Sequence, residues 1–497
     1  MAEKFFWADA LADRIIKEKG DKKEYVCASG ITPSGQVHIG NFREVITTDM
    51  VVRALRDKGK KVKFIYSWDD FDRFRKVPKG VDKGYEKYLG MPISDIPSPF
   101  NKGMSYAEFN EKEFENSLKN VHIEPEFIYQ SEMNKKSSYA DLIKLALGKK
   151  ETIVSILNKY RKEPLPKDWL PIMIYCKKCK KDTTKITSHD GYNISYKCEC
   201  DSEQTVDIRK EGIISIRWRV DWPLRWFYEK VDFEPGGIDH SVHGGSFTTA
   251  KEISKQVFGF EPPIYQFYEW ISIKGGDAFS SSSGNATTLK EVGEIYTPEV
   301  LRFLFVGTKP RSAFEISFDN DVIKRYEDFD MLEKKYFNGD ANPKEKRMYE
   351  LSIIKIPKKK PEREGFRHLV SLVQIGKTDN LNQESKDRAE KAKSWIEKYA
   401  GDDIKFEVRE KIEAGLTKKE KQVLLKLKEI LEKKTYKNDQ ELFSSFYEIL
   451  EKEKILNTEF FDIAYRAIIG KKKGPRLASL IINIGQKKVI KLLETIK

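Results

Sequence analysis

The chain has 497 residues, 39% of them hydrophobic and 34% charged, and its formal net charge is +13. This length predicts several domains, and no apolar run approaches the roughly 20 residues that a membrane-spanning helix requires. Residues 1–20 alternate charged with apolar side chains and lack the uninterrupted apolar centre of a secretory signal. We therefore expect a cytoplasmic protein that does not bind membranes.

Lysine and arginine are concentrated in the last third of the chain. Residues 331–497 contain 39 Lys and Arg against 27 Asp and Glu, whereas residues 1–330 contain 52 against 51. A nearly neutral first part and a basic second part predict catalysis in the former and binding of a polyanion in the latter. The alternative is that the lysine-rich helices of the second part are simply well solvated.

The first predicted unit is a strand, a turn and a helix. Residues 25–28 form a short apolar run, residues 29–41 are rich in Gly, Pro and Ser, and residues 42–55 have a helical composition. This order presents backbone N–H groups and a helix N-terminus to a phosphate. His38 and Gly40 stand at the helix entrance, where an imidazole can donate a hydrogen bond to a phosphate and a glycine lets a base approach. A plain glycine-rich turn is the alternative.

A second strand is predicted over residues 62–68, and the acidic residues Asp69, Asp70 and Asp72 follow it directly. The first strand, the helix and this strand form a βαβ unit, which implies a parallel sheet. The acidic residues then lie at the carboxyl end of a strand, the edge at which open α/β sheets bind ligands. They are candidates for binding a divalent cation or a substrate ammonium; a solvated acidic turn is the alternative. Further helices are predicted over 108–120, 139–160, 248–258 and 418–434, and a further strand over 264–273.

Four of the five cysteines form two tight pairs, Cys176-x-x-Cys179 and Cys198-x-Cys200, with 18 residues between Cys179 and Cys198. Two thiolate pairs on tight turns suit a tetrahedral zinc site, and the segment between them can form the hairpin of a zinc ribbon. Such a zinc would be structural, because the protein fills all four coordination positions. The alternative is two reduced cysteine pairs without a metal.

A glycine-rich loop over residues 236–246 contains Asp239, His240 and His243. Such a loop lets the backbone approach a ribose or an aminoacyl group, while Asp239 and His240 accept or donate hydrogen bonds. A metal site is disfavoured, because the two histidines have no third ligand beside them. A plain glycine turn is the other alternative.

Residues 38–41, His-Ile-Gly-Asn, resemble the His-Ile-Gly-His signature of class I aminoacyl-tRNA synthetases. The longer pattern Thr-Pro-Ser-Gly-x-x-His-x-Gly-Asn, over 32–41, resembles the class I type of lysyl-tRNA synthetase. A loop of small residues matches the second signature of class I synthetases, Lys-Met-Ser-Lys-Ser, at Phe279, Ser280 and Ser282, but its lysines are absent. The same loop, read alone, could be a flexible surface segment.

The resemblance covers residues 22–318 with specific motifs and implies an α/β fold. It implies a Rossmann-type catalytic domain over 1–164 and 222–318, interrupted by a zinc-ribbon-like insertion over 165–221. It also implies that the basic helical region over 319–497 binds the tRNA anticodon.

The implied reaction has two steps. The carboxylate of lysine attacks the α-phosphate of Mg²⁺-ATP to give lysyl-adenylate and pyrophosphate, and the lysyl group then passes to the terminal adenosine of tRNA(Lys). The resemblance implies catalytic roles for His38, Asn41, Ser280 and Ser282. We predict a catalytic role for Lys274 as well, because it is the nearest substitute for the missing signature lysines. It implies ATP binding by Pro33, Ser34, Gly35, His38, Gly40, Asn41, Gly245 and Phe279. It implies lysine binding by Gly30, Thr32, Asp69, Asp70, Trp222, Asp239, His240 and Tyr268.

Two alternatives remain open at this point. One is another class I synthetase, chiefly the glutamyl type, against which the pattern over 32–41 and the cysteine spacing argue. The other is a non-catalytic tRNA-binding relative, which the missing signature lysines would suit. The intact His38, Gly40 and acidic turn favour catalysis. A monomer is favoured, although nothing in the sequence determines the oligomeric state.

Overall fold

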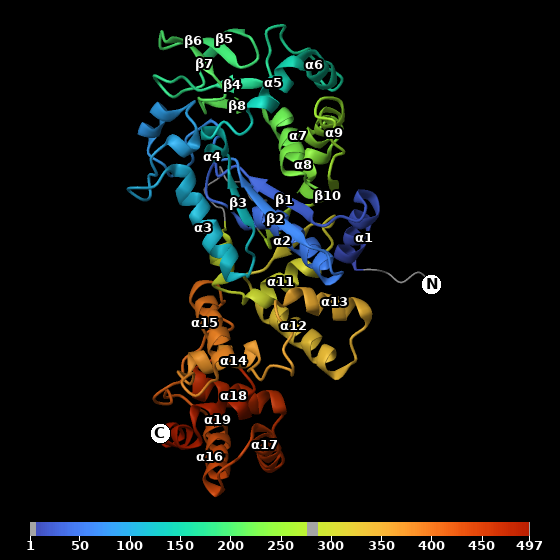
Figure 1. Ribbon diagram of the computed structural model, residues 1–497. Helices are drawn as coiled ribbons and strands as arrows, with labels where there is room; N and C mark the ends of the chain where they lie inside the picture. Colours follow the sequence, from blue (N-terminus) through green and yellow to red (C-terminus); the bar gives the residue numbers. More distant parts are fainter. Residues whose placement is uncertain (1–5, 276–286, 497) are drawn as a thin grey trace. The chain divides into compact units, whose positions relative to one another are not determined.

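The computed structural model describes residues 6–275 and 287–496 of the chain (Figure 1). The chain divides into two compact units. Unit 1 comprises Met1–Gly293, Pro298–Ile316 and Ala341–Ile356, and unit 2 comprises Glu294–Thr297, Ser317–Asp340 and Pro357–Lys497. In the described part of the chain, no helix combines the length and the apolar character needed to cross a membrane.

The centre of unit 1 is a five-stranded sheet in which every pairing is parallel. Its strands are β1 (Tyr25–Ile31), β2 (Val62–Trp68), β3 (Glu126–Tyr129), β9 (Phe233–Gly237) and β10 (Ile264–Tyr268), in the order β10-β9-β1-β2-β3. β1 and β2 pair along their whole lengths, whereas β9 contacts the other side of β1. This is the doubly wound arrangement, and it confirms the predicted Rossmann-type α/β fold.

Helices flank the sheet and complete unit 1. They are α1 (Trp7–Lys19), α2 (Ile39–Asp57), α3 (Tyr106–Asn120), α4 (Gln130–Lys135), α7 (Trp218–Glu229), α8 (Ile238–Ser241), α9 (Ser246–Gln256), α10 (Leu289–Gly293), α11 (Pro298–Val306) and α13 (Pro343–Ser352). Two 3₁₀ helices, η1 (Lys83–Tyr88) and η2 (Ile93–Asp95), precede α3. α2 is buried along most of its length, because its apolar residues lie on nearly every side.

Two predicted elements are each divided in the structure. The single helix predicted over 139–160 is wrong: α5 (Ala140–Gly148) and α6 (Lys150–Asn158) are separated at Lys149, directly after a glycine, which weakens a helix interior by about 1 kcal/mol relative to alanine. The single strand predicted over 264–273 is also wrong. β10 ends at Tyr268, the N–H of Glu269 donates to the Pro310 carbonyl, and β11 (Ile271–Ile273) pairs instead with β12 (Phe314–Ile316) in a separate sheet.

The cysteine-containing segment forms two small antiparallel sheets. One pairs β4 (Ile172–Ile174) with β8 (Ile214–Ile216), and the other contains β5 (Thr184–His189), β6 (Asn193–Cys198) and β7 (Glu203–Asp207). Apolar residues of these strands share one core with α5, α6 and α7. The predicted hairpin between the cysteine pairs is therefore present, and the core beneath it extends into the surrounding helices.

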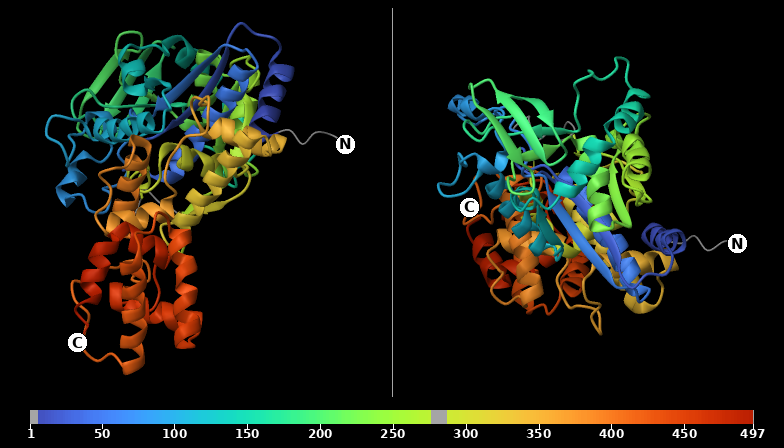
Figure 2. Two further views of the ribbon diagram at one scale, coloured as in Figure 1. Left: turned by 90° about the horizontal axis from the view of Figure 1, so that it is seen from below. Right: turned by 45° about the horizontal axis from the view of Figure 1, so that its top comes forward.

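Every described element of unit 2 is a helix, and Figure 2 shows its orange and red helices gathered beside one another. They are α12 (Asp321–Asn338), α14 (Phe366–Gln374), α15 (Gln383–Lys398), α16 (Lys418–Lys433), α17 (Asp439–Glu453), α18 (Asn457–Ile469), α19 (Leu477–Ile484) and α20 (Gln486–Leu493). The last five share one apolar core. α16 begins with a capping box in which Thr417 and Glu420 satisfy each other's backbone N–H groups.

A buried ion pair joins several helices of unit 1. The guanidinium of Arg302, on α11, lies 2.5 Å from the carboxylate of Asp49, on α2, and Arg302 is 0% exposed. The same guanidinium donates to the carbonyls of Val121, after α3, and Leu351, on α13. Such a pair tolerates removal of one partner poorly, because the other charge is then left buried without compensation.

We predict that Arg302→Met lowers the free energy of unfolding of unit 1 by about 3–5 kcal/mol. Urea unfolding followed by tryptophan fluorescence measures this, since every tryptophan except Trp395 lies in unit 1. The double variant Asp49→Leu/Arg302→Met should lose less stability than Arg302→Met alone, because no unpaired charge remains. Equal losses in the two variants would contradict this account of the pair.

Candidate active site

The carboxyl ends of the parallel strands meet at one edge of the sheet, and the sequence order reverses between β1 and β9. Ligands bind at such a switch point in open α/β sheets. The strands approach closely here: a Cβ on Gly30 would lie 2.6 Å from the carbonyl oxygen of Ser67. Only glycine fits that position without displacing β2.

The turn after β1 leads directly into α2. His38 occupies the N-cap position in an extended conformation, and its backbone N–H donates to the side-chain oxygen of Asn41 at 3.1 Å. The side chain of Tyr106, on α3, donates to the carbonyl of Ser34 at 3.1 Å and anchors the turn. Pro33, Gly35 and Gly40, which the resemblance assigns to ATP, lie within the same turn and helix entrance.

Burial lowers the pKa of His38 to about 4, so the imidazole is neutral at physiological pH. A neutral ring can still donate one hydrogen bond to a phosphate oxygen, but it adds no positive charge. Positive charge near a bound triphosphate must therefore come from elsewhere.

The segment that corresponds to the second signature has both of its ends anchored. On one side, the backbone N–H of Lys274 donates to the Ile316 carbonyl at 3.0 Å. On the other side, Thr288 forms an antiparallel bridge with His38, and the Ile39 N–H donates to the Thr287 carbonyl at 2.8 Å. The start of α2 thus pairs with Thr287 and Thr288, which follow the second signature in the sequence. Phe279, Ser280 and Ser282 lie outside the described residues.

The prediction did not include Glu44, which lies two turns into α2. One carboxylate oxygen accepts the Gly30 N–H at 2.8 Å, and the other accepts the Tyr268 hydroxyl at 2.8 Å. Glu44 therefore connects the end of β1 to the end of β10. The available signal was its position: His38, Asn41 and Glu44 follow one another at intervals of three residues, which places the acidic side chain near the helix face of His38 and Asn41.

Burial raises the pKa of Glu44 to about 8, against the lowering by its hydrogen bonds from Gly30 and Tyr268. The negative charges of Glu234 and Asp69 raise it further. Among the described residues, no cation lies within ion-pairing distance of Glu44. The site thus contains a partly buried carboxylate that has no cationic partner among the described residues.

The acidic turn after β2 has different partners for each carboxylate. Asp69 receives two hydrogen bonds from the Arg225 guanidinium, at 2.5 and 3.3 Å. Asp70 instead accepts hydrogen bonds from the backbone N–H and the hydroxyl of Ser131. Asp72 accepts the Thr32 hydroxyl at 3.1 Å.

Arg225 also pairs with Asp221 at 3.0 Å and donates to the Ser67 hydroxyl at 2.8 Å. Its positive charge is thus shared between the carboxylates of Asp69 and Asp221. The predicted site did not include Arg225. Burial raises the pKa values of Asp70 and Asp72 to about 6 and that of Asp221 to about 7. No motif indicated Arg225, because two of its partners, Ser67 and Asp69, lie far from it in the sequence.

An aromatic wall lies on α7, beside this network. The ring of Trp222 stacks on Trp218, with centroids 5.1 Å apart, and lies 5.6 Å from the ring of His240. One turn further along α7, the indole N–H of Trp226 donates to Glu234 at 2.5 Å. The structure therefore brings the predicted Trp222 and His240 together.

The glycine-rich loop after β9 approaches the same edge. A Cβ on Gly237 would lie 2.4 Å from a carboxylate oxygen of Asp239, and one on Gly245 would lie 2.5 Å from the His240 carbonyl. The glycines therefore allow the loop to fold tightly and to begin α9 at Ser246. The side chain of Asp239 is 54% exposed, so it faces an accessible region.

The four predicted zinc ligands form a cluster at the far end of unit 1. Their sulfur atoms all lie within 4.8 Å of one another, with Cys176 and Cys200 3.7 Å apart and Cys179 and Cys198 3.6 Å apart. A tetrahedral zinc with Zn–S bonds of about 2.3 Å requires sulfur atoms about 3.8 Å apart. The donor set and its geometry fit Zn²⁺.

Comparison with known proteins agrees with this geometry. Residues 5–355 match the family described as tRNA synthetases class I (K). The chain is 44% identical over 505 residues to a lysine--tRNA ligase of Borreliella burgdorferi, covering 96% of this chain and 97% of that one. It is 40% identical to the lysine--tRNA ligase of Pyrococcus horikoshii (98% and 99% covered) and 40% identical to that of Treponema pallidum (98% and 98%). The chain therefore belongs to the class I (K) family of tRNA synthetases.

Proposed function

We propose that this protein ligates L-lysine to tRNA(Lys), with ATP as the energy source and lysyl-adenylate as the intermediate. Family membership supports the reaction class, and the named relatives support the amino acid. The structural observation that carries the choice of lysine is Glu44, the partly buried carboxylate without a cationic partner among the described residues. An ammonium group of the substrate would supply the missing positive charge.

The same observation argues against the glutamyl alternative. A glutamate side chain would need a cation in the pocket, but the guanidinium of Arg225 is already shared by Asp69 and Asp221. A further carboxylate next to Glu44 would add like-charge repulsion. The ε-ammonium of lysine, covered by the aromatic face of Trp222, would instead be stabilised by both groups.

In the first step, the residues mainly position the substrates and stabilise charge. The neutral His38 would donate to the α-phosphate of Mg²⁺-ATP, while Asn41 holds the helix entrance in place. Lys274, Ser280 and Ser282 remain proposed for the pyrophosphate side, with Lys274 supplying charge that His38 does not. The residues predicted to bind lysine remain proposed for it, together with Glu44: Gly30, Thr32, Asp69, Asp70, Trp222, Asp239, His240 and Tyr268.

In the second step, the terminal adenosine of the tRNA must reach the active site while the anticodon binds elsewhere on the protein. The basic helices over residues 319–497 remain proposed for the anticodon. The four cysteines would hold a structural Zn²⁺, which orders the turns around β5–β7 and takes no part in the reaction.

The function is tested by charging assays with lysine and with glutamate, each with ATP and with and without tRNA. We expect lysine alone to be ligated, and His38→Ala to lower the rate by about 10²–10³-fold, the loss of one preorganised donor. His189→Ala, on the exposed strand β5, is the matched control and should behave like the wild type. Charging with glutamate, or no charging at all, would refute the proposed function.

A second prediction concerns the pH dependence of lysine binding. Because lysine should bind to the ionised form of Glu44, the KM for lysine should fall about tenfold per pH unit up to about pH 8 and then level off. Glu44→Gln should remove this dependence and raise the KM at least about 30-fold. Tyr268→Phe removes a hydrogen bond that lowers the pKa of Glu44, so it should move the midpoint to higher pH. An unchanged profile in Glu44→Gln would assign the titration to another group.

A third prediction concerns the cysteines. The purified protein should contain about one zinc per chain, and Cys198→Ala should lose the metal and lower the melting temperature. Cys27→Ala is the control, because Cys27 lies in β1 and outside the cluster, and it should retain the metal. Metal analysis of each variant decides the point. A full zinc content in the double variant Cys198→Ala/Cys200→Ala would place the metal elsewhere.

A further inference from the structure

The cysteine-containing segment contacts the acidic turn of the candidate active site. Tyr175 directly precedes Cys176, the first of the four clustered cysteines, and its hydroxyl donates to the carbonyl of Phe71 at 3.0 Å. The two aromatic rings meet edge to face, with centroids 5.1 Å apart, and both side chains are buried. A residue next to a cysteine of the cluster thus lies directly against the turn that contains Asp70 and Asp72.

The backbone of the acidic turn is held from two sides. The carbonyls of Asp70 and Asp72 accept the backbone N–H groups of Ser94 at 3.0 Å and Ile93 at 2.9 Å. Between them, the Phe71 carbonyl accepts only the Tyr175 hydroxyl among the residues that the structure describes. A buried acceptor that loses its donor disfavours the conformation in which it is buried. The hydroxyl of Tyr175 therefore stabilises one conformation of the turn.

A second contact joins the same two segments. The carboxylate of Asp182 pairs with the guanidinium of Arg73 at 3.1 Å, and the Asp182 N–H donates to the Gly90 carbonyl at 2.8 Å. Asp182 follows Lys181, whose carbonyl accepts the Cys176 N–H at 2.8 Å. Residues 175–182, which we call the knuckle, thus form one closed turn that contacts the chain at and after the acidic turn.

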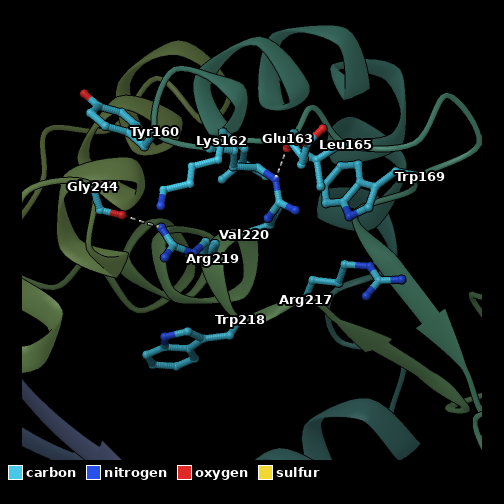
Figure 3. Close-up of a pocket in the computed structure, with 12 residues that line it drawn as sticks. Tyr160, Lys162, Glu163, Leu165, Trp169, Arg217, Trp218, Arg219, Val220 and Gly244 are labelled. Atoms are coloured by element: carbon cyan, nitrogen blue, oxygen red, sulfur yellow. Dashed lines mark hydrogen bonds between the residues drawn. The ribbon is translucent and has the colours of Figure 1, made fainter.

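The knuckle is attached to a rigid base. The N–H of Tyr175 donates to the Ile213 carbonyl at 2.9 Å, which extends the pairing of β4 with β8 by one residue. Directly after β8, the N–H of Arg217 donates to the Pro171 carbonyl at 2.9 Å. The guanidinium of Arg217 lies 5.9 Å from the ring centroid of Trp169, and both residues line the pocket in Figure 3. The two ends of the insertion therefore hold Tyr175 in place.

The acidic turn in turn fixes residues that we propose for lysine. The carboxylate of Asp72 accepts the Thr32 hydroxyl at 3.1 Å, and the carboxylate of Asp69 is paired with Arg225. Asp70 lies between these two positions and is bonded to Ser131 in α4. A change in the backbone of the turn therefore moves the lysine side of the site, whereas the entrance of α2, proposed for the phosphates, has its own contacts.

We propose that Tyr175 is a positioning residue for the lysine site: its hydroxyl holds the acidic turn in the conformation that binds lysine, and the metal-loaded cysteine cluster holds Tyr175. The inference rests on the proposed function, in which Asp69, Asp70 and Thr32 bind lysine. Tyr175 acts through the Phe71 carbonyl. Binding of Zn²⁺ would order the knuckle by fixing Cys176 and Cys179, and it would supply no chemistry to the reaction.

The test removes the hydroxyl and keeps the ring. In Tyr175→Phe, the affinity for lysine is measured by isothermal titration calorimetry on the metal-loaded protein, and the KM values for lysine and ATP are measured by charging assays. We expect the Kd and the KM for lysine to rise about five- to tenfold, and the KM for ATP to change less than about twofold, since only the lysine side loses its support. A merely structural role of Tyr175 would lower the melting temperature without separating lysine from ATP.

Tyr192→Phe is the matched control. Tyr192 belongs to the same insertion, but its hydroxyl donates to Asp141 of α5 at 2.7 Å rather than to the acidic turn. The control should bind lysine and ATP like the wild type. Metal analysis should find the same zinc content in the wild type, Tyr175→Phe and Tyr192→Phe, because no cysteine is changed.

Removal of the metal by a chelator provides a second measurement. Calorimetry should show weaker lysine binding by the metal-free wild type, and a smaller further loss in metal-free Tyr175→Phe, because the hydroxyl that transmits the effect is already absent. Unchanged lysine affinity in Tyr175→Phe, equal losses for lysine and ATP, or equal effects of metal removal on both proteins would overturn the inference. The proposed function fails differently, if the wild type itself does not ligate lysine, so the two failures are distinguishable.

Discussion

The site depends on one constraint, the parallel pairing of β1 with β2 on one side and with β9 on the other. Three strands from distant parts of the chain thereby end at the same edge, and the segments after them converge. Because Gly30 has no side chain, β1 stays close to the Ser67 carbonyl and in register with β2 up to the end of both strands. His38, Asn41 and Glu44 then extend along α2 from the turn toward β10.

Several carboxylates at this edge of the sheet are withdrawn from solvent, which raises their pKa values. Residues with raised pKa values include Glu44, Asp70, Asp72, Asp221 and Glu234. Each of them lowers the stability of the fold as the pH rises from the ordinary to the raised pKa, because the unfolded chain releases a proton that the folded chain retains. The positive charge of Arg225 offsets only part of the stability lost when these carboxylates ionise. The uncompensated negative charge is consistent with a substrate that carries a positive charge.

The net charge of the first part of the chain does not reveal how its charged residues are distributed. Residues 1–330 are nearly neutral as a whole, yet their charges are segregated: carboxylates gather at the sheet edge, and four cations line a cavity beside Tyr160, between the end of α6 and the start of α7 (Figure 3). Trp218, which lines this cavity, stacks on Trp222 of the candidate active site.

The sequence by itself determined the features that depend on neighbouring residues. The strand–turn–helix around His38, the parallel βαβ unit, the helical second part and the zinc-compatible cysteine pairs all follow from local spacing, and the structure contains each of them. Tertiary structure alone decided the partners of the site residues. Glu44, Arg225 and the Asp70–Ser131 contact could not be read from motifs, because each joins segments far apart in the chain. The strand break at Glu269 was missed for a related reason: strand-forming residues continue on both sides of it, but the pairing partner changes from β9 to β12. The helix break at Lys149 follows Gly148, and the apolar pattern on both sides of it favoured one continuous helix.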